Sequence, residues 1–246
     1  MKLSKNFQIF RLIFRERYRE PTIEIVFPFM IASNIFLPAF LERGFFQTYA
    51  IVLALFPIIS VSETIAFALG LRNIIFVTGN HIYRGSIIPF LMLPIKRNAI
   101  FFMTYFSDVI FPYILWLSSL EFYLIISGIY VPSIIIITFT CGYFFIENII
   151  YLISLTFKSE GISTLLSIFT SGIIFIFGGI LNYELIISNS SLLLLSSFSN
   201  PFIVLLAQYE ENKNMLNFLL SGLLIEILIL TFALLYSYIR FVRLEI

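Results

Sequence analysis

The last long apolar run of the chain reads MLNFLLSGLLIEILILTFALLYSYI over residues 215–239, and its one charged residue is Glu226. A helix needs about 20 predominantly apolar residues to cross the hydrocarbon core of a bilayer. The run therefore predicts a transmembrane helix. Five further apolar runs precede it, at residues 23–41, 45–69, 99–117, 132–157 and 162–181.

The composition agrees with six membrane spans. Of the 246 residues, 60% are hydrophobic and 12% are charged, and the mean hydropathy is +1.01. Soluble domains carry about 25% charged residues. This composition excludes a soluble globular domain, a disordered chain, a nucleic-acid binder and a disulfide scaffold. Six spans leave no room for a soluble catalytic domain, so we expect one all-α transmembrane domain over residues 1–246.

The placement of Lys and Arg predicts the orientation, because loops on the cytoplasmic side carry more of these residues. With six spans and a cytoplasmic N-terminus, the outer segments hold only Arg43 and Lys213. Both termini are then cytoplasmic, and the protein is a multi-pass protein of the cytoplasmic (plasma) membrane. The inner segments hold the other basic residues: Lys2, Lys5, Arg11, Arg15, Arg17, Arg19, Arg72, Arg84, Lys96, Arg97, Lys158, Arg240 and Arg243.

Two stretches do not fit a simple helix-and-loop pattern. Residues 99–126 stay apolar well beyond one span, so this helix is either long and tilted or ends near Ser118 and Ser119, with Glu121 starting an interfacial piece. The connection 182–214 is half apolar and is divided by Asn200 and Pro201. Its apolar pieces are too short to span a membrane, so we expect an outer re-entrant segment.

Residues 3–20 have the pattern of an amphipathic helix. Arg11, Arg15 and Arg19 form a basic stripe, and Pro21 ends the pattern. We expect an interfacial helix along the inner leaflet; the alternative is a basic flank with no specific role. Its charges suggest local pairs of Glu16 with Arg19 and of Arg17 with Glu20. The apolar residues that share one helical face are Leu3, Phe7, Phe10, Phe14 and Tyr18.

The longest inner connection is residues 71–98, which mix polar and apolar side chains. A simple turn needs far fewer residues. We expect this loop to contain a short helix that docks on a neighbouring protein; the alternative is a passive loop. The sequence has no Gly-x-x-x-x-Gly-Lys-[Ser/Thr] phosphate loop, so an ATP site would have to come from another chain.

In this order, the features resemble the membrane subunits of type-2 ABC exporters. Members of that family have a short amphipathic helix before six spans, a coupling helix between the second and third spans, and a re-entrant segment after the fifth. The acidic residue that the family carries before the coupling-loop glycine is absent, and Asn80 and His81 stand there. The motifs behind the resemblance are His81-Ile82-Tyr83-Arg84-Gly85-Ser86, Leu93-Pro94-Ile95-Lys96-Arg97, Phe177-Gly178-Gly179-Ile180 and Ser199-Asn200-Pro201-Phe202.

The resemblance implies two membrane subunits, the second being another copy or a homologue, above two cytoplasmic ATP-binding subunits. ATP and Mg would be bound by those subunits, and this chain would hold no cofactor. The substrate would pass between the membrane subunits. Gly178 and Gly179 would lie near the exit, although simple helix packing explains them equally well. The residues implied to contact the ATPase are Tyr83, Arg84, Gly85, Ser86 and Pro94.

Acidic residues fall inside the predicted spans, where no Lys or Arg is present. Ionisable groups at bilayer depth are costly and are candidates for function. Glu63, Asp108 and Glu147 lie about 9–15 Å from the inner ends of their helices. They are candidates for a substrate path that favours cationic or amphipathic amines. The alternative is that they are neutral acids that hydrogen-bond between helices, as Glu226 could also be.

Four classes of function follow from these features. An ABC exporter permease is the leading interpretation, with a small hydrophobic molecule, a lipid, a peptide or a polymer as substrate. An ATP-independent carrier or channel that uses the intramembrane acids is the main alternative, and a non-transporting scaffold is a third. An intramembrane enzyme is disfavoured, because His81 is the single histidine and Cys141 the single cysteine. We therefore expect no catalytic residue and no metal site.

Overall fold

The computed structural model describes residues 5–19, 21–41, 51–92, 95–128, 131–157, 159–210 and 214–244. Within these ranges the regular elements are helices, and no strand occurs. Five helical stretches are long and apolar enough to cross a membrane, which confirms the prediction of an all-α membrane protein. They are Ile58–Tyr83, Arg97–Ser127, Ser133–Thr156, Glu160–Ile187 and Leu216–Val242. A further apolar helix, α2 (Thr22–Leu41), precedes them.

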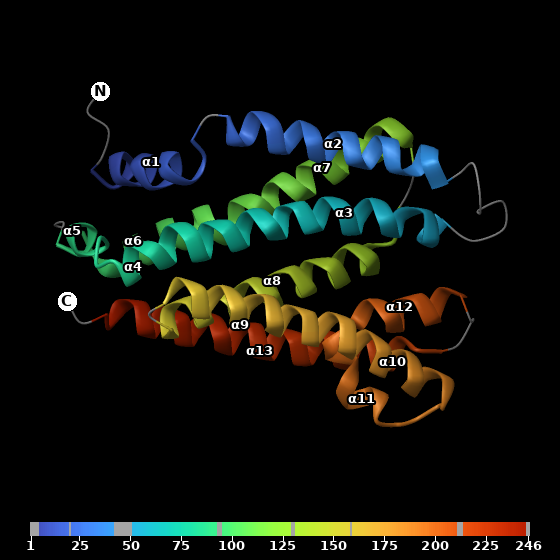
Figure 1. The fold of residues 1–246 in the computed structure, drawn as a ribbon. Helices are drawn as coiled ribbons and strands as arrows, with labels where there is room; N and C mark the ends of the chain where they lie inside the picture. Colours follow the sequence, from blue (N-terminus) through green and yellow to red (C-terminus); the bar gives the residue numbers. More distant parts are fainter. Residues whose placement is uncertain are drawn as a thin grey trace.

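The long helices lie side by side along a common direction (Figure 1). α2 packs on α3 (Ile51–Arg72) and on α7 (Phe111–Ser127), and α3 also contacts α8 (Ser133–Thr156). α8 in turn has its most extensive contacts with the last helix, α13 (Leu216–Val242). α8 is therefore the central helix, and it contributes many of the fully buried side chains of the core.

The second membrane helix is much longer than its apolar run. α3 continues without a break into a π-helical segment, η1 (Asn73–Gly79), and then into α4 (Asn80–Tyr83). The sequence predicted an end near residue 69 and a loop over 71–98. The first half of that stretch is instead helical, because hydropathy marks the end of the apolar layer and not the end of the helix. Residues 84–96 make the actual connection, which contains the short helix α5 (Ile88–Leu91).

The third membrane helix is continuous over α6 (Arg97–Tyr105), the π-helical segment η2 (Phe106–Ile110) and α7. Of the two predicted arrangements, the single long helix is therefore the one observed. Ser119 does not interrupt it, because its buried hydroxyl donates to the Trp116 carbonyl at 2.8 Å. The helix ends at Gly128, whose N–H donates to the Leu124 carbonyl at 2.9 Å.

The fifth membrane helix is also interrupted by a π-helical segment. It consists of α9 (Glu160–Gly172), η3 (Ile173–Phe177) and α10 (Gly178–Ile187). The following connection contains α11 (Leu193–Ser196), the 3-10 helix η4 (Ser197–Ser199) and α12 (Pro201–Glu210). None of these three pieces reaches the length of a span.

Both ends of the chain lie at the same end of the bundle, together with α1 (Lys5–Arg17) and α5 (Figure 1). One contact fixes part of this arrangement: Arg97, at the start of α6, donates to the Val242 and Leu244 carbonyls at the end of α13, each at 3.0 Å. A guanidinium on the last carbonyls of a helix satisfies acceptors that have no partner within that helix. The segments that are rich in Lys and Arg therefore gather at one end.

Candidate functional site

A cavity of about 410 Å³ lies within the membrane-spanning part, between α3, α8, η3 and the start of α12. This volume falls within the range of small-molecule binding sites, about 300–1,000 Å³. α3 and α8 each present one helical face to it, since the lining residues recur at intervals of three and four. The lining residues are Ser60, Glu63, Thr64, Phe67, Thr138, Phe139, Gly142, Tyr143, Ile146, Phe175, Asn200, Pro201 and Phe202.

Among the described residues that line this cavity, Glu63 is the one with an acidic or basic side chain. Among the described residues, it forms no hydrogen bond and no ion pair. Its half-buried side chain shares a face of α3 with Ser60, Thr64 and Phe67. The sequence named Glu63 as a candidate for the substrate path, and the structure places it in the wall of this cavity.

Asn200 holds the far wall of the cavity in place. Its side-chain amide donates to the Phe175 carbonyl in η3 at 2.9 Å, and its own carbonyl accepts a hydrogen bond from Asn182 at 3.1 Å. A π-helical turn changes the hydrogen-bond register of the helix and exposes backbone acceptors. The Asn200 amide satisfies one such acceptor at membrane depth. The sequence identified Asn200 as part of a motif but not as the partner of η3.

Gly178 and Gly179 pack against the outer segment and do not line the cavity. A Cβ atom at Gly179 would lie 3.0 Å from the Asn200 amide nitrogen. A Cβ atom at Gly178 would overlap the Ser199 side chain and lie 3.1 Å from its carbonyl oxygen. The two glycines therefore permit the close approach of residues 199–200 to α10, which corresponds to the packing explanation.

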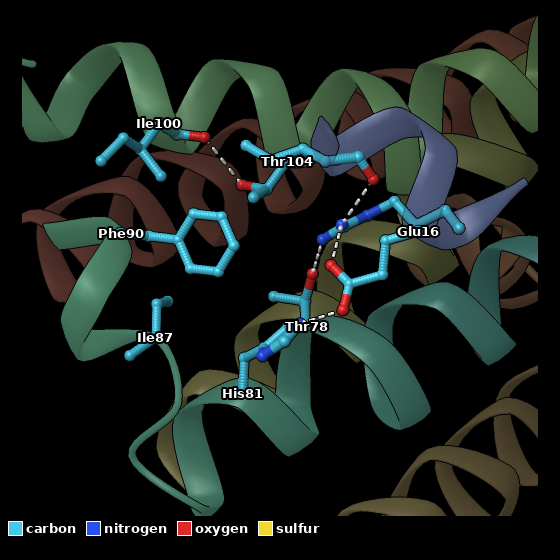
Figure 2. Close-up of a pocket in the computed structure, with 9 residues that line it drawn as sticks. Glu16, Thr78, His81, Ile87, Phe90, Ile100 and Thr104 are labelled. Carbon is cyan, nitrogen blue, oxygen red and sulfur yellow. Dashed lines mark hydrogen bonds and ion pairs between the residues drawn. The ribbon is translucent and has the colours of Figure 1, made fainter. Parts of the chain in front are cut away.

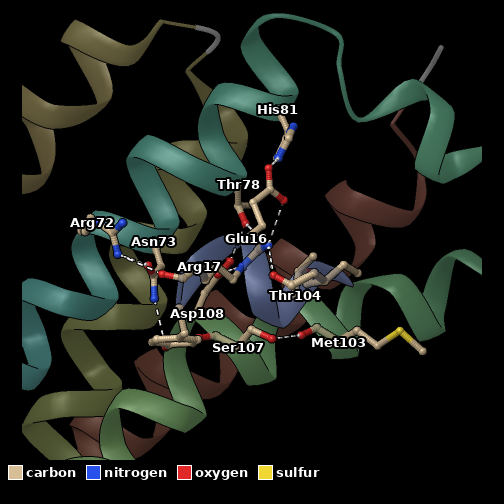
Figure 3. Close-up of polar contacts among 12 residues, drawn as sticks. Glu16, Arg17, Arg72, Asn73, Thr78, His81, Met103, Thr104, Ser107 and Asp108 are labelled. Carbon is tan, nitrogen blue, oxygen red and sulfur yellow. Dashed lines mark hydrogen bonds and ion pairs between the residues drawn. The ribbon is translucent and has the colours of Figure 1, made fainter. Parts of the chain in front are cut away.

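Asp108 lies outside the cavity, in a buried polar cluster with Arg17 and Thr78 (Figure 3). The Arg17 Nε donates to one Asp108 carboxylate oxygen. The Thr78 hydroxyl donates to the other at 2.5 Å and accepts a hydrogen bond from Arg17 at 2.6 Å. α1, η1 and η2 each supply one of these residues, so the cluster joins three segments that are far apart in the sequence.

The sequence suggested a local partner for Arg17, Glu20, and did not point to Asp108. Arg17 is 1% exposed, and its guanidinium also donates to the Ile13 carbonyl at 3.0 Å. Burial acts against its charge, but the neighbouring Asp108 carboxylate outweighs burial and raises the pKa of Arg17 above its usual value. A signal was available: Arg17 follows Ile13 and Phe14 by four and three residues, so it lies on the apolar face of α1 and away from the exposed stripe.

A second layer of hydrogen bonds surrounds this pair (Figure 3). The Tyr18 hydroxyl donates to the Ser107 carbonyl at 2.6 Å and accepts a hydrogen bond from Asn73 at 3.0 Å. Arg72 donates to the Arg17 carbonyl at 3.1 Å. Burial raises the pKa of Tyr18 far above its usual value, so this hydroxyl stays protonated and keeps donating at physiological pH.

The apolar face of α1 packs on the third membrane helix. The rings of Phe14 and Tyr18 each lie 4.7 Å, centre to centre, from Phe111, and Phe10 lies 5.7 Å from Phe106. Edge-to-face ring pairs at such distances stabilise by about 0.5–1.5 kcal/mol each. On the other side of α1 the basic stripe of Arg11, Arg15 and Arg19 is exposed.

The residues expected to contact an ATPase gather at the turn after α4. The Tyr83 hydroxyl donates to Ser163 of α9 at 2.8 Å, while Arg84 is exposed. Gly85 has φ +70°, a left-handed conformation that favours glycine. Ser86 hydrogen-bonds to His81. Pro94 lies outside the described residues.

His81 connects this turn to α1 (Figure 2). Its Nδ1 atom lies 2.8 Å from the Ser86 hydroxyl, and its Nε2 atom lies 2.7 Å from a Glu16 carboxylate oxygen. The pocket beside it has a volume of about 20 Å³, enough for about one water molecule. This pocket is therefore a packing gap between α1, α4 and α5, and His81 is a contact residue there.

Glu147 and Glu226 are fully buried between helices, and no described residue hydrogen-bonds to their carboxyl oxygens. Glu147 lies against Gly70, where a Cβ atom would overlap its carboxyl group. Neither residue lines the cavity. The three acids proposed for the substrate path thus have different surroundings: Glu63 faces the cavity, Asp108 binds Arg17, and Glu147 packs against α3.

Comparisons with known proteins identify no relative of this chain: no protein-family model, no curated protein and no solved structure matches it.

Proposed function

We propose that this chain is the permease subunit of an ATP-driven exporter of the type-2 ABC class, with ATP bound and hydrolysed on a separate cytoplasmic subunit. The main support is the arrangement at one end of the bundle. There the second membrane helix continues beyond its apolar run to an exposed turn at Arg84–Ser86, and α1 packs beside it through Glu16 and His81. A partner docked on an exposed turn at the end of a long membrane helix could displace that turn and move the helix with it.

In this proposal α2 is the first of six spans, which adds one to the five long helices, and both termini face the cytoplasm. The thirteen basic residues on that side, against two on the other, support the orientation. Two permease subunits enclose the substrate path. The fifth helix has an exposed apolar face with room for such a neighbour, which includes Leu165, Phe169, Ile176 and Phe177.

The first prediction concerns the turn itself. Arg84→Glu should weaken recovery of the ATPase with the purified complex by about 5–30-fold, because an arginine at the centre of an interface typically contributes about 1–2 kcal/mol or more. The measurement is the ATP hydrolysis that co-purifies with the tagged chain after mild solubilisation of its native membranes. Arg243→Glu is the matched control, since Arg243 is exposed at the same end of the bundle.

Two results would contradict the proposal. One is that no protein with a phosphate-loop ATPase site accompanies the wild-type chain. The other is that the purified chain alone moves a substrate across vesicles that contain no ATP.

The second outcome would favour the alternative, an ATP-independent carrier. The observation behind this alternative is Glu63, a carboxyl group without a described partner on the wall of a membrane cavity. Such a group can exchange a proton or a cation during transport. The same vesicle experiment, with and without a proton gradient, separates the two functions.

A further inference from the structure

We propose that the cavity around Glu63 binds a hydrophobic organic cation, such as a quaternary ammonium or phosphonium ion with aromatic or alkyl substituents. This inference rests on the proposed function, because it names the class of substrate that the permease would carry. Nothing in the binding argument requires an ATPase, so the site can be tested independently of the partner subunit.

The charge of the cavity wall favours a cation. Glu63 lies on the wall of an apolar cavity inside the membrane-spanning part, and the described residues that line this cavity include no Lys, Arg or His. A carboxylate in such a place is costly unless a cation accompanies it. A bound cation would supply the missing charge partner.

The second argument is the aromatic lining. Aromatic residues from four separate segments line the cavity: Phe67 on α3, Phe139 and Tyr143 on α8, Phe175 in η3 and Phe202 at the start of α12. The rings of Phe139 and Phe202 are in contact, with centres 5.4 Å apart. Ring faces attract cations that lie within about 6 Å, and several rings together recognise quaternary ammonium groups. The lining therefore provides both apolar contact and attraction for a diffuse positive charge.

The third argument is that the other polar groups of the wall are already committed. The Thr64 hydroxyl donates to the Ser60 carbonyl at 2.6 Å, and the Thr138 hydroxyl donates to the Ile134 carbonyl at 2.8 Å. The Asn200 amide donates to Phe175. Few donors remain for an anion or for a sugar with many hydroxyl groups. A cation without hydrogen-bonding groups needs none of them.

The size of the cavity favours an organic cation over an inorganic one. A cavity of about 410 Å³ is far larger than a bare inorganic cation needs. Within the described residues, no group of three His, Cys, Asp or Glu side chains is placed to ligate a metal ion. An organic cation fills the space with apolar substituents and brings its charge to Glu63.

The test is direct binding of radiolabelled tetraphenylphosphonium to the purified chain in lipid nanodiscs, with empty nanodiscs subtracted. Wild-type protein should bind saturably, and Glu63→Gln should weaken binding by at least about tenfold. Glu147→Gln is the matched control, since Glu147 is also a glutamate in a membrane-spanning helix but does not line the cavity. Tetraphenylborate, which has the same shape and the opposite charge, should not compete.

A second measurement covers the case in which Glu63→Gln does not fold. A cysteine at Thr64, on the cavity wall, should react with a cationic methanethiosulfonate reagent, and tetraphenylphosphonium should slow that reaction; the native Cys141 is buried. The site is refuted if wild-type protein binds no more cation than empty nanodiscs, if Glu63→Gln binds as well as wild type, or if the Thr64→Cys reaction is not slowed. If the chain binds the cation but recruits no ATPase, the cation site is supported and the proposed ABC permease function is refuted. If the chain recruits an ATPase but does not bind the cation, only the cation site is refuted.

Discussion

Replacing Arg17 by Met should destabilise the protein by about 3–5 kcal/mol, because the Asp108 carboxylate would remain buried without its counterion. Asp108 is 0% exposed, and its described partners are Arg17 and Thr78. The chain contains its own reporter of unfolding, since Cys141 is its single cysteine and is buried. The measurement is the temperature at which this thiol becomes reactive toward a thiol-specific dye in detergent.

A double substitution tests whether the charge pair is the cause. Asp108→Asn alone should also destabilise, because it leaves the Arg17 charge buried, whereas the two changes together should recover part of the loss. Arg15→Met is the control on the same helix, since Arg15 is exposed and such substitutions change stability by about 0.5 kcal/mol or less. Equal melting of Arg17→Met and Arg15→Met, or strictly additive losses in the double variant, would contradict a buried charge pair.

Alanine at Gly222 should destabilise the outer segment by about 1–3 kcal/mol, because the added Cβ cannot fit without a backbone shift. That atom would lie 2.8 Å from the Ser197 carbonyl carbon and 2.7 Å from its hydroxyl oxygen. Gly178→Ala should have a similar effect, since its Cβ would overlap Ser199. The two glycines contact η4 from two different helices, α13 and α10, so the combined variant should lose more stability than either single one.

The same dye experiment measures these losses, and Gly172→Ala is the matched control. Gly172 lies in the same membrane helix as Gly178, but a Cβ atom there would meet nothing within 4 Å. Alanine at Gly172 should leave the melting temperature unchanged or raise it slightly, since alanine favours helix. If Gly222→Ala and Gly178→Ala melt like Gly172→Ala, the outer segment does not pack on these helices as described.

The sequence predicted the helical membrane fold well, because one physical quantity, the length of apolar runs, determines it. The length of the apolar runs did not predict where the helices end. Arg72, Asn73 and Thr78 end the apolar run, yet the helix continues through them. Their side chains are satisfied by α1 and η2, as in the bonds from Arg72 to the Arg17 carbonyl and from Thr78 to Asp108. Tertiary partners of this kind are not visible in a local pattern.

The candidate site was predictable only in part. The cost of an ionisable group at bilayer depth drew attention to Glu63 and Asp108, but it did not reveal that one faces a cavity and the other a guanidinium. The local charge pattern favoured a pair between Arg17 and Glu20, whereas the observed partner of Arg17 is 91 residues away. The distant pair forms because Arg17 shares a helical face with Phe14 and is carried into the core when that face packs.

The unbroken helix from Ile51 to Tyr83 has a mechanical consequence. Glu63 and Tyr83 lie on the same rod, about 30 Å apart at about 1.5 Å per residue. Because no loop separates Glu63 from the Arg84 turn, a partner that rotates this turn would also rotate the part of the helix that carries Glu63 in the cavity wall. α1 contacts this long helix through Glu16 and Arg17, and these contacts would limit how far the helix can rotate.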